Sequence, residues 1–498
     1  MTMYAGRRVL ALFFAILLLA GCATSTDNRS SSSSGTFPVA PEIAPNVEFW
    51  TKVYGVWSRN QAALYDDEYL GVVYEVIDLT ASAGGDTAYR RDLIDARRAA
   101  LQSRLRNVER KVASGESLSG ADKALYKQLT AAGGSAAIVG AADRVRVQRG
   151  IREKFRGGLE VSGRYDDAFR EIFRARGLPE DLAYLPHVES SFQLNARSGV
   201  GAGGVWQFMP ATGRLYMHVG HAVDERYDPI IAAKGAAQYL ANAHDRLGAW
   251  PLAVTSYNHG VGGMQRAKAI YGDDFGAIAR RYKGPAFGHS SRNFYAQFLA
   301  AREVAGNPRK YFPEGVAYER PVKTDRLVLR HSLPAPQVAS HYGVSVDRLA
   351  DLNPAWRTAA RSGRAPLPAG TTVWLPAGST QRVASHPAPM PVMIAKAEPK
   401  AQPARPAVAA AKPQPVKVAA TGSSAKAVKV AAKAPAAQPA KVAAAKKPEV
   451  KHHVVQPNET LYRVAVRYEI SVDELKRINR LPANDNTIRP GQRLRVTI

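Results

Sequence analysis

The chain has 498 residues, enough for about three domains of ordinary size, and 46% apolar and 22% charged residues are typical of a globular protein. Its 68 Lys and Arg residues outnumber 42 Asp and Glu residues. The resulting formal net charge of +26 suits a polyanionic partner: nucleic acid, an anionic membrane surface or an acidic wall polymer. The single cysteine excludes an intramolecular disulfide framework, and no Cys/His cluster has zinc-ligand spacing. We therefore expect neither a metal nor another cofactor.

The N-terminus has the features of an export signal. Arg7 and Arg8 precede an apolar run, residues 9–20, which is short for a transmembrane helix. The run leads into Leu-Ala-Gly-Cys, ending at Cys22, and this resembles the lipobox of bacterial lipoproteins. The resemblance implies that residues 1–22 are a lipoprotein signal peptide and that Cys22 carries a lipid anchor. Because Ala23 follows, it also implies the outer membrane, with the protein facing the periplasm. A plain signal peptide with an incidental cysteine is the alternative.

The next segments differ sharply in composition. Residues 23–40 are mostly polar and small, and are predicted to be a flexible tether. Aromatic residues, which need burial, are then dense between residues 47 and 74. Further on, apolar residues recur at helical spacing opposite a face of arginines: Ile94, Leu101, Leu105, Val108 and Val112. The stretch 47–175 is therefore predicted to be largely helical, and residues 41–140 are predicted to form a helical N-terminal region. We interpret its arginine face as solvated, with a binding surface as the alternative.

An internal repeat brackets a linker near the C-terminus. Residues 341–353 align with residues 467–479, and a β-strand is predicted before and after each copy. Between Pro391 and Val450, ten Lys and one Arg accompany two Glu, a net charge of +9, and scattered prolines forbid a long helix. Residues 378–451 are therefore predicted to be an extended Ala/Pro/Lys linker, which accounts for part of the chain's net charge.

The second copy of the repeat predicts a βααβ module over residues 452–498. One apolar stripe on its first helix and a capping box at its second support this; the residues are Leu461, Val464, Ala465 and Tyr468, and Ser471 with Glu474. The pattern resembles the LysM family, whose members bind the N-acetylglucosamine of peptidoglycan or chitin. The resemblance implies that the sugar lies between two loops, with contacts from Asn458, Thr460, Leu461 and Ile488.

The first copy, residues 325–377, departs from this pattern. An apolar, proline-containing segment, residues 331–336, replaces the polar Asn-Glu-Thr-Leu opening at 458–461. We therefore predict a degenerate LysM-like module there, which is either a packed structural relic or a sugar site.

A glutamate in the middle of the chain stands out. A helix through this segment would place Leu182, Leu185 and Glu189 on one side, so an acid ends an apolar stripe. In an apolar cleft, burial favours the neutral carboxyl, which is the form that a general acid needs at neutral pH. Pro186 lacks an amide hydrogen, so the helix is predicted to kink or restart there. A capping or surface glutamate is the alternative.

Three further motifs follow this glutamate. The first, residues 198–213, has four glycines in six residues, which allow sharp turns and close approach to a ligand, and then Trp206, Gln207 and Met209. It lacks the Gly-Lys-Ser/Thr of a nucleotide-binding loop. The second, residues 253–263, contains Tyr257 and Asn258, and the third, residues 291–295, opens an apolar helix.

Together the four ordered motifs resemble the catalytic domain of the lysozyme-like lytic murein transglycosylases, especially the membrane-bound D type. The resemblance implies a mainly α fold, with a lysozyme-like α-helical catalytic domain over residues 141–315 beside the small βααβ modules. It assigns the catalytic acid/base to Glu189 and glycan or cleft contacts to Ser190, Gln207, Met209, Tyr257, Asn258 and Tyr295. Tyr295 is expected to pack against Glu189 or hydrogen-bond it. One departure bears on Tyr295, because Ser291-Arg292 replaces the family's acidic-Thr pair.

The resemblance implies cleavage of the β-1,4 bond between N-acetylmuramic acid and N-acetylglucosamine with formation of a 1,6-anhydro ring. A hydrolytic muramidase and a non-catalytic peptidoglycan-binding protein are the alternatives. Hydrolysis usually needs two carboxylates, and Asp224, Glu225 and Asp228 are interpreted as caps for the helix after Pro229, so one acid favours the transglycosylase. We expect peptidoglycan glycan strands as partner, membrane contact through Cys22, a monomer and, because the chain is exported, no nucleic acid.

Overall fold

The structure is a computed structural model that describes residues 35–80 and 87–385 and, near the C-terminus, 452–455, 461, 464, 468, 472–482, 488–489 and 491–496. Cys22 and most of the predicted linker lie outside the described residues. The chain divides into two units, one ending at Ala395 and one beginning at Lys396. Within the described parts, every helix is too short or too polar to cross a membrane.

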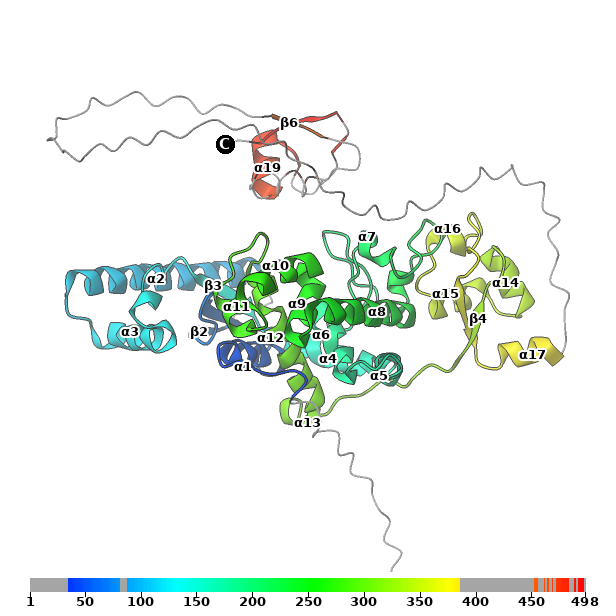
Figure 1. Cartoon of the computed structure of the whole chain (residues 1–498), viewed down its shortest axis with the longest axis horizontal. Helices are drawn as coiled ribbons and strands as arrows, with labels where there is room; N and C mark the ends of the chain where they lie inside the picture. The colour runs from blue at the N-terminus through cyan, green and yellow to red at the C-terminus, as the bar shows by residue number, and fades with distance from the viewer. Residues whose placement is uncertain are drawn as a thin grey trace, which may run out of the picture. The chain divides into compact units, whose positions relative to one another are not determined.

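Helices dominate the first unit (Figure 1), which confirms the mainly α fold class. The N-terminal elements are α1 (Ala44–Gly55), β1 (Gln61–Asp66), β2 (Val73–Asp78), α2 (Thr87–Ser114), α3 (Gly120–Gly133), η2 (Ser135–Ala137) and β3 (Val145–Arg149). The central elements are α4 (Arg152–Ser162), α5 (Asp166–Arg174), η3 (Glu180–Tyr184), α6 (Leu185–Glu189), α7 (Pro210–Gly213), η4 (Glu225–Tyr227), α8 (Pro229–Leu247), α9 (Trp250–His259), α10 (Val261–Tyr271), α11 (Phe275–Arg281), α12 (His289–Gly306) and α13 (Pro308–Tyr311).

A three-stranded antiparallel sheet, in the order β2-β1-β3, lies in the region predicted to be largely helical. That prediction is wrong for residues 61–78 and 145–149. The central strand β1 is buried along nearly its whole length, so its sequence shows no alternation that would separate a strand from a helix. Since β3 pairs with β1, the sheet crosses the boundary predicted at residue 141.

The long predicted helix is present as α2, with Leu105 and Val108 buried as its spacing predicted. It forms an antiparallel hairpin with α3 (Figure 1), where Arg104 Nε contacts Asp122 Oδ1 at 2.9 Å. Solvent faces most of its other arginines, as expected for a charged helix face.

The packed structure begins inside the segment predicted to be a tether. Phe37 is buried, and its ring lies 5.0 Å from that of Phe298 and 5.9 Å from that of Trp250. An apolar side chain of this size gains free energy by leaving water. Phe37 therefore belongs to the core formed with α8, α9 and α12, with Ala40 packed against it, and the tether prediction is wrong for these two residues.

A first βααβ module, here called the first module, spans residues 324–376. Its elements are β4 (Thr324–Val328), α14 (Ala335–His341), α15 (Val346–Leu352), α16 (Thr358–Arg361) and β5 (Thr372–Pro376), followed by α17 (Ser379–Ser385). The strands β4 and β5 pair antiparallel, as the internal repeat predicted.

The second unit contains β6 (His452–Val454), α19 (Val472–Asn479) and β7 (Arg493–Arg495), with β6 and β7 antiparallel. Leu461, Leu475 and Leu494 share its buried core. Leu461 was expected to contact sugar, but only 1% of it is exposed, so its side chain is a core residue. Ile488 is partly buried against that core, while Asn458 and Thr460 lie outside the described residues.

Asp66 holds the sheet together at the end of β1, where its side chain is fully buried. Its carboxylate accepts hydrogen bonds from the amides of Glu68 and Tyr69 at 2.9 and 3.0 Å, from the Tyr74 hydroxyl at 3.1 Å and from Arg144 Nε at 3.0 Å. Removing one partner of a buried ion pair leaves the other charge uncompensated.

We therefore expect Asp66→Asn to lower the free energy of unfolding by about 3 kcal/mol. Asp95→Asn, on the exposed face of α2, is the matched control and should change it by less than about 0.5 kcal/mol. Urea unfolding followed by tryptophan fluorescence measures both. Equal midpoints for Asp66→Asn and wild type would show that this network does not stabilise the sheet.

Candidate active site

Glu189 is the last residue of α6, a helix that starts afresh after the 3-10 turn η3. Pro186 lies in the first turn of α6, where its missing amide hydrogen costs nothing, so the predicted restart is confirmed. The helix stops because Ser191 and Phe192 adopt positive φ angles of 50° and 59°. Non-glycine residues take this conformation only where the surroundings enforce it.

The helix α4 packs directly against this strained turn. A Cβ added at Gly158 would lie 2.5 Å from the Ser191 carbonyl oxygen, so only glycine allows α4 to approach so closely. The position of Glu189 is therefore determined by α4 as well as by its own helix.

Burial raises the pKa of the Glu189 carboxyl to about 8. Its side chain keeps some solvent contact, yet the carboxyl is surrounded by protein and makes no hydrogen bond or ion pair with any residue that the structure describes. The carboxyl is therefore neutral at pH 7 and can donate a proton, as the apolar stripe predicted.

His187 packs behind Glu189 without competing for its proton. Its ring stacks on Phe155 at 5.0 Å and contacts Phe192 at 4.9 Å, and burial together with the charge of Arg170 lowers its pKa to about 3. The imidazole is therefore neutral over the physiological range.

Ser190 joins Glu189 to the glycine-rich segment, here called the glycine loop, residues 198–209. The buried Ser190 hydroxyl donates to the Val205 carbonyl at 2.9 Å. Gln207, with a φ of 50°, donates from Nε2 to the Gly204 carbonyl at 2.7 Å. Both side chains, expected to contact glycan, are used to shape the loop.

Other predicted residues lie around the same loop. The Tyr257 hydroxyl donates to the Trp206 carbonyl at 3.0 Å, and Ser291 Oγ donates to Asn258 Oδ1 at 2.8 Å. Asn258 is exposed, and 41% of Met209 is exposed, so both are accessible to a ligand. Glu189 contributes to raising the pKa of Tyr257, after burial, which places that phenol close to the carboxyl.

Tyr295 does not lie where the resemblance implied. It is fully buried, its hydroxyl donates to the Pro38 carbonyl at 3.0 Å, and its ring lies edge-on to Phe275 at 5.1 Å. A buried phenol needs a hydrogen-bond acceptor, and here the N-terminal segment predicted to be a tether supplies it. The expected hydrogen bond to Glu189 is therefore wrong, because the hydroxyl is bonded to Pro38.

Tyr54, on α1, is the residue that the sequence analysis missed. It is buried, it stacks on Phe155 at 5.1 Å, and Val188 packs against the same cluster. Glu189 is a cause of its raised pKa, second to burial, so the two side chains are close. The Tyr54 hydroxyl has no hydrogen bond to any described residue, and the only sequence signal for it was the density of aromatic residues after residue 47.

Of the three acids interpreted as caps for the helix after Pro229, only Asp228 caps it, while Glu225 accepts a hydrogen bond from the His218 amide at 2.7 Å. Asp228 accepts hydrogen bonds from the amides of Ile230 and Ile231 at 2.9 Å and begins α8. Asp224 caps η4. The described residues contain no cluster of His, Cys, Asp and Glu that could hold a metal ion.

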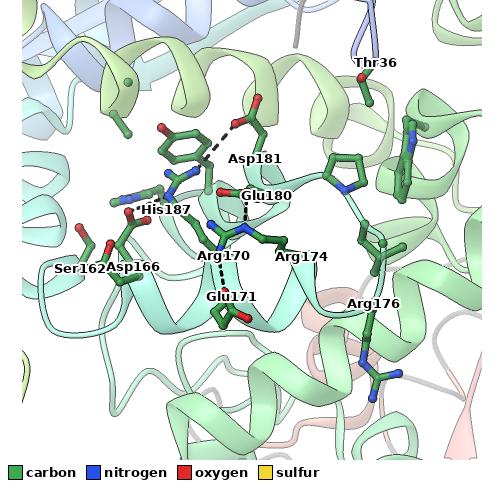
Figure 2. Close-up of a pocket in the computed structure, with 18 of the residues that line it drawn as sticks. Thr36, Ser162, Asp166, Arg170, Glu171, Arg174, Arg176, Glu180, Asp181 and His187 are labelled. Atoms are coloured by element: carbon green, nitrogen blue, oxygen red, sulfur yellow. Dashed lines mark hydrogen bonds and ion pairs between the residues drawn. The ribbon is translucent and has the colours of Figure 1, made fainter. Parts of the chain in front are cut away.

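A cavity of about 1560 Å³ opens next to the site but does not include Glu189. Figure 2 shows its lining of charged side chains from α5 and η3, where Arg170 pairs with Asp166 and Arg174 with Glu180. It reaches His187, which lies on the same helix, α6, as Glu189. Because Glu189 is not part of its lining, we do not place the reaction there.

Comparison with known proteins agrees with this geometry. The family model described as Transglycosylase SLT domain matches residues 168–275, and the LysM domain model matches residues 453–497. The membrane-bound lytic murein transglycosylase D of Escherichia coli K12 is 27% identical over 182 residues, 36% of this chain and 40% of that protein. A membrane-bound lytic murein transglycosylase F 2 of Alkalilimnicola ehrlichii is 35% identical over 118 residues, 22% of this chain and 25% of that protein.

Among solved structures, the chain is similar to the lytic transglycosylase Slt of Pseudomonas aeruginosa, with 21% identity, a TM-score of 0.24, and coverage of 31% of this chain and 25% of that one. The chain spans about two fifths of the length of the curated transglycosylase D that it matches. Residues 168–275 form a transglycosylase SLT domain, residues 453–497 form a LysM domain, and the chain is homologous to the membrane-bound lytic murein transglycosylase D of Escherichia coli.

Proposed function

We propose that the protein is a peptidoglycan lytic transglycosylase that cleaves the β-1,4 bond between N-acetylmuramic acid and N-acetylglucosamine. The observation that carries this proposal is the neutral, unpaired carboxyl of Glu189 within the matched SLT domain. Protonation of the glycosidic oxygen requires an acid that still holds its proton at neutral pH, and a carboxyl with a pKa near 8 meets that requirement.

The reaction proceeds in two proton transfers through one residue. Glu189 gives its proton to the oxygen that leaves with N-acetylglucosamine. The resulting carboxylate then takes the proton from the C6 hydroxyl of the muramyl residue, whose oxygen attacks C1 and closes the 1,6-anhydro ring. The carboxyl ends protonated, so one residue completes the cycle without water as a reactant.

The electrostatics of the site favour this route over hydrolysis. Glycoside hydrolases usually place a second carboxylate within about 5–10 Å of the acid. Such a neighbour would raise the pKa of Glu189 further by charge repulsion, yet among the described residues burial is the cause of the shift. Asp224 and Asp228 are already occupied as helix caps and in hydrogen bonds.

The flanking segments suit an enzyme held at the cell wall. We propose that the lipidated Cys22 anchors a monomer in the outer membrane, facing the periplasm, and that the LysM domain holds glycan strands. The basic linker then extends between the catalytic domain and the LysM domain along an anionic polymer. The "membrane-bound" in the names of the relatives supports the anchoring.

Glu189→Gln should lower the release of muropeptides from purified sacculi by at least about 1000-fold, because an amide cannot act as acid or base. Glu171→Gln, on the exposed face of α5, is the matched control and should retain wild-type turnover. Mass spectrometry of the products should show 1,6-anhydromuramyl ends.

Each other outcome identifies an alternative. Reducing muramyl ends would make the protein a hydrolytic muramidase. Unchanged lysis by Glu189→Gln would place catalysis elsewhere, and binding of sacculi without any lysis by the wild type would make it a non-catalytic peptidoglycan-binding protein.

Tyr54→Phe should retain the aromatic stacking on Phe155 but lower kcat about tenfold, because it removes the nearby hydroxyl that we propose donates a hydrogen bond of about 1.4 kcal/mol to the Glu189 carboxylate once that residue has given up its proton. Tyr295→Phe tests the position that the resemblance favoured. It should lower the melting temperature, because the hydrogen bond to the Pro38 carbonyl is lost. Its kcat should stay within about twofold of the wild-type value, a change in activation free energy smaller than about RT. The reverse ranking of the two kcat values would contradict the placement of Tyr54 beside Glu189.

A further inference from the structure

The first module joins the catalytic domain through one segment, residues 222–228. The Asp224 amide donates to the Ala355 carbonyl at 2.8 Å, and the Arg357 amide donates to the Ala222 carbonyl at 2.9 Å. The two backbones therefore pair as a short antiparallel ladder, a geometry that fixes their relative register.

Apolar packing reinforces this pairing. Ala222 and Val223, which precede α8, are members of the first module's hydrophobic core together with Trp356 and Leu349. Val223 is fully buried there. Two residues of the catalytic domain thus complete the core of a module for which the sequence left open a packed structural relic or a sugar site.

Two polar contacts cross the same boundary. The guanidinium of Arg357 forms an ion pair with the buried carboxylate of Asp224. The indole Nε1 of Trp374 donates to Asp228 Oδ2 at 2.6 Å, and the other oxygen of Asp228 caps α8. The side-chain carboxyl groups of both aspartates therefore accept part of their hydrogen bonds from residues of the first module.

Asp224 connects the first module to the glycine loop through Arg226. Its carboxylate also accepts from Arg226 Nε and Nη2 at 2.9 and 2.8 Å. Burial raises the pKa of Asp224, but the two guanidinium groups of Arg226 and Arg357 outweigh it and hold that pKa below its ordinary value. The carboxylate is thus charged and shared between a catalytic-domain arginine and a first-module arginine.

Arg226 in turn closes the glycine loop. Its Nη1 donates to the carbonyls of Gly201 and Phe208, both at 2.8 Å. Gly204, with a φ of 73°, lies so close to the Arg226 backbone that an added Cβ would be 1.8 Å from its carbonyl oxygen. The same loop supplies the carbonyls that hold Ser190 and Tyr257.

We propose that the first module is part of the catalytic unit and that Arg357 is a positioning residue for the reaction, holding the glycine loop in register with Glu189 through Asp224 and Arg226. This inference rests on the proposed function. The first module then contributes to turnover whether or not it binds sugar. The catalytic domain covers Ala355 and Trp356 of its contact surface and partly covers Arg357 and Trp374.

The test uses the full chain with Arg357→Met, which removes the charge and the hydrogen bonds of the side chain, and Arg357→Lys, which restores the charge. Arg348→Met, at an exposed position on α15, is the matched control. Steady-state kinetics are measured on soluble, uncrosslinked glycan strands, and hydrogen exchange is followed in the peptides that cover residues 198–209.

We expect Arg357→Met to lower kcat about tenfold, since small displacements of positioning groups have large effects on rate, with KM changed less than twofold. Exchange in the glycine loop should become faster. Arg357→Lys should recover part of kcat, and Arg348→Met should match wild type in both measurements. Trp374→Phe, which keeps an aromatic ring but removes the bond to Asp228, gives a second, milder variant if Arg357→Met does not fold.

Wild-type kcat and unchanged loop exchange in folded Arg357→Met and Trp374→Phe would overturn the inference. A fall in kcat with unchanged loop exchange would overturn it as well, because Arg357 would then not act on the site through the glycine loop. If the wild type releases no muropeptides, the proposed function fails instead. Loop exchange in the variants still tests the coupling of the first module to the loop in that case.

Discussion

The site is arranged around one buried carboxyl that has no hydrogen-bond or ion-pair partner among the described residues. Glu189 ends a five-residue helix, and burial alone keeps its proton on at neutral pH. A cation beside the carboxyl would defeat this, because it would stabilise the carboxylate and lower the pKa. The surroundings are accordingly aromatic and aliphatic, from Phe155 and His187 on one side to Tyr54 and Tyr257 on the other.

Holding such a group in place requires support from several distant segments. The helix α4 fits beneath the strained turn after Glu189 because Gly158 has no side chain. The helix α1 brings Tyr54 to the site, and it is fixed on α12 by a hydrogen bond of 2.8 Å between the buried side chains of Asn46 and Asn293. On the other flank, the glycine loop is tied to Ser190 and to the segment that contacts the first module. The strain near the acid is balanced by this packing.

The sequence predicted the parts whose signal is local. Glu189, the restart at Pro186, the long helix α2 and the strands of both βααβ modules follow from spacing, from proline chemistry and from an internal repeat. The sheet in the N-terminal region was missed because its short central strand is buried throughout and reads like any apolar run. Phe37 was assigned to a tether because a single aromatic residue in a polar segment does not show where it packs.

Side-chain roles were harder to predict than the positions of motifs. Ser190 and Tyr257 are near the acid as expected, yet they and Gln207 each donate a hydrogen bond to a backbone carbonyl. Tyr295 was misplaced because the acceptor of its hydroxyl, the Pro38 carbonyl, comes from a segment more than 250 residues away in sequence. Contacts of this kind, like that between Arg357 and Asp224, depend on tertiary packing and leave no periodic trace in the sequence.

The central claim is that burial holds a proton on Glu189, and direct titration tests it. Carbon-13 NMR of glutamate labelled at the side-chain carboxyl would follow the signal that is absent in Glu189→Gln. Because the pKa is raised, the carboxyl should remain neutral through pH 7 and ionise with a midpoint near 8. A midpoint near the ordinary glutamate value of about 4.3 would show that the carboxyl is charged at neutral pH, and would contradict its role as the acid.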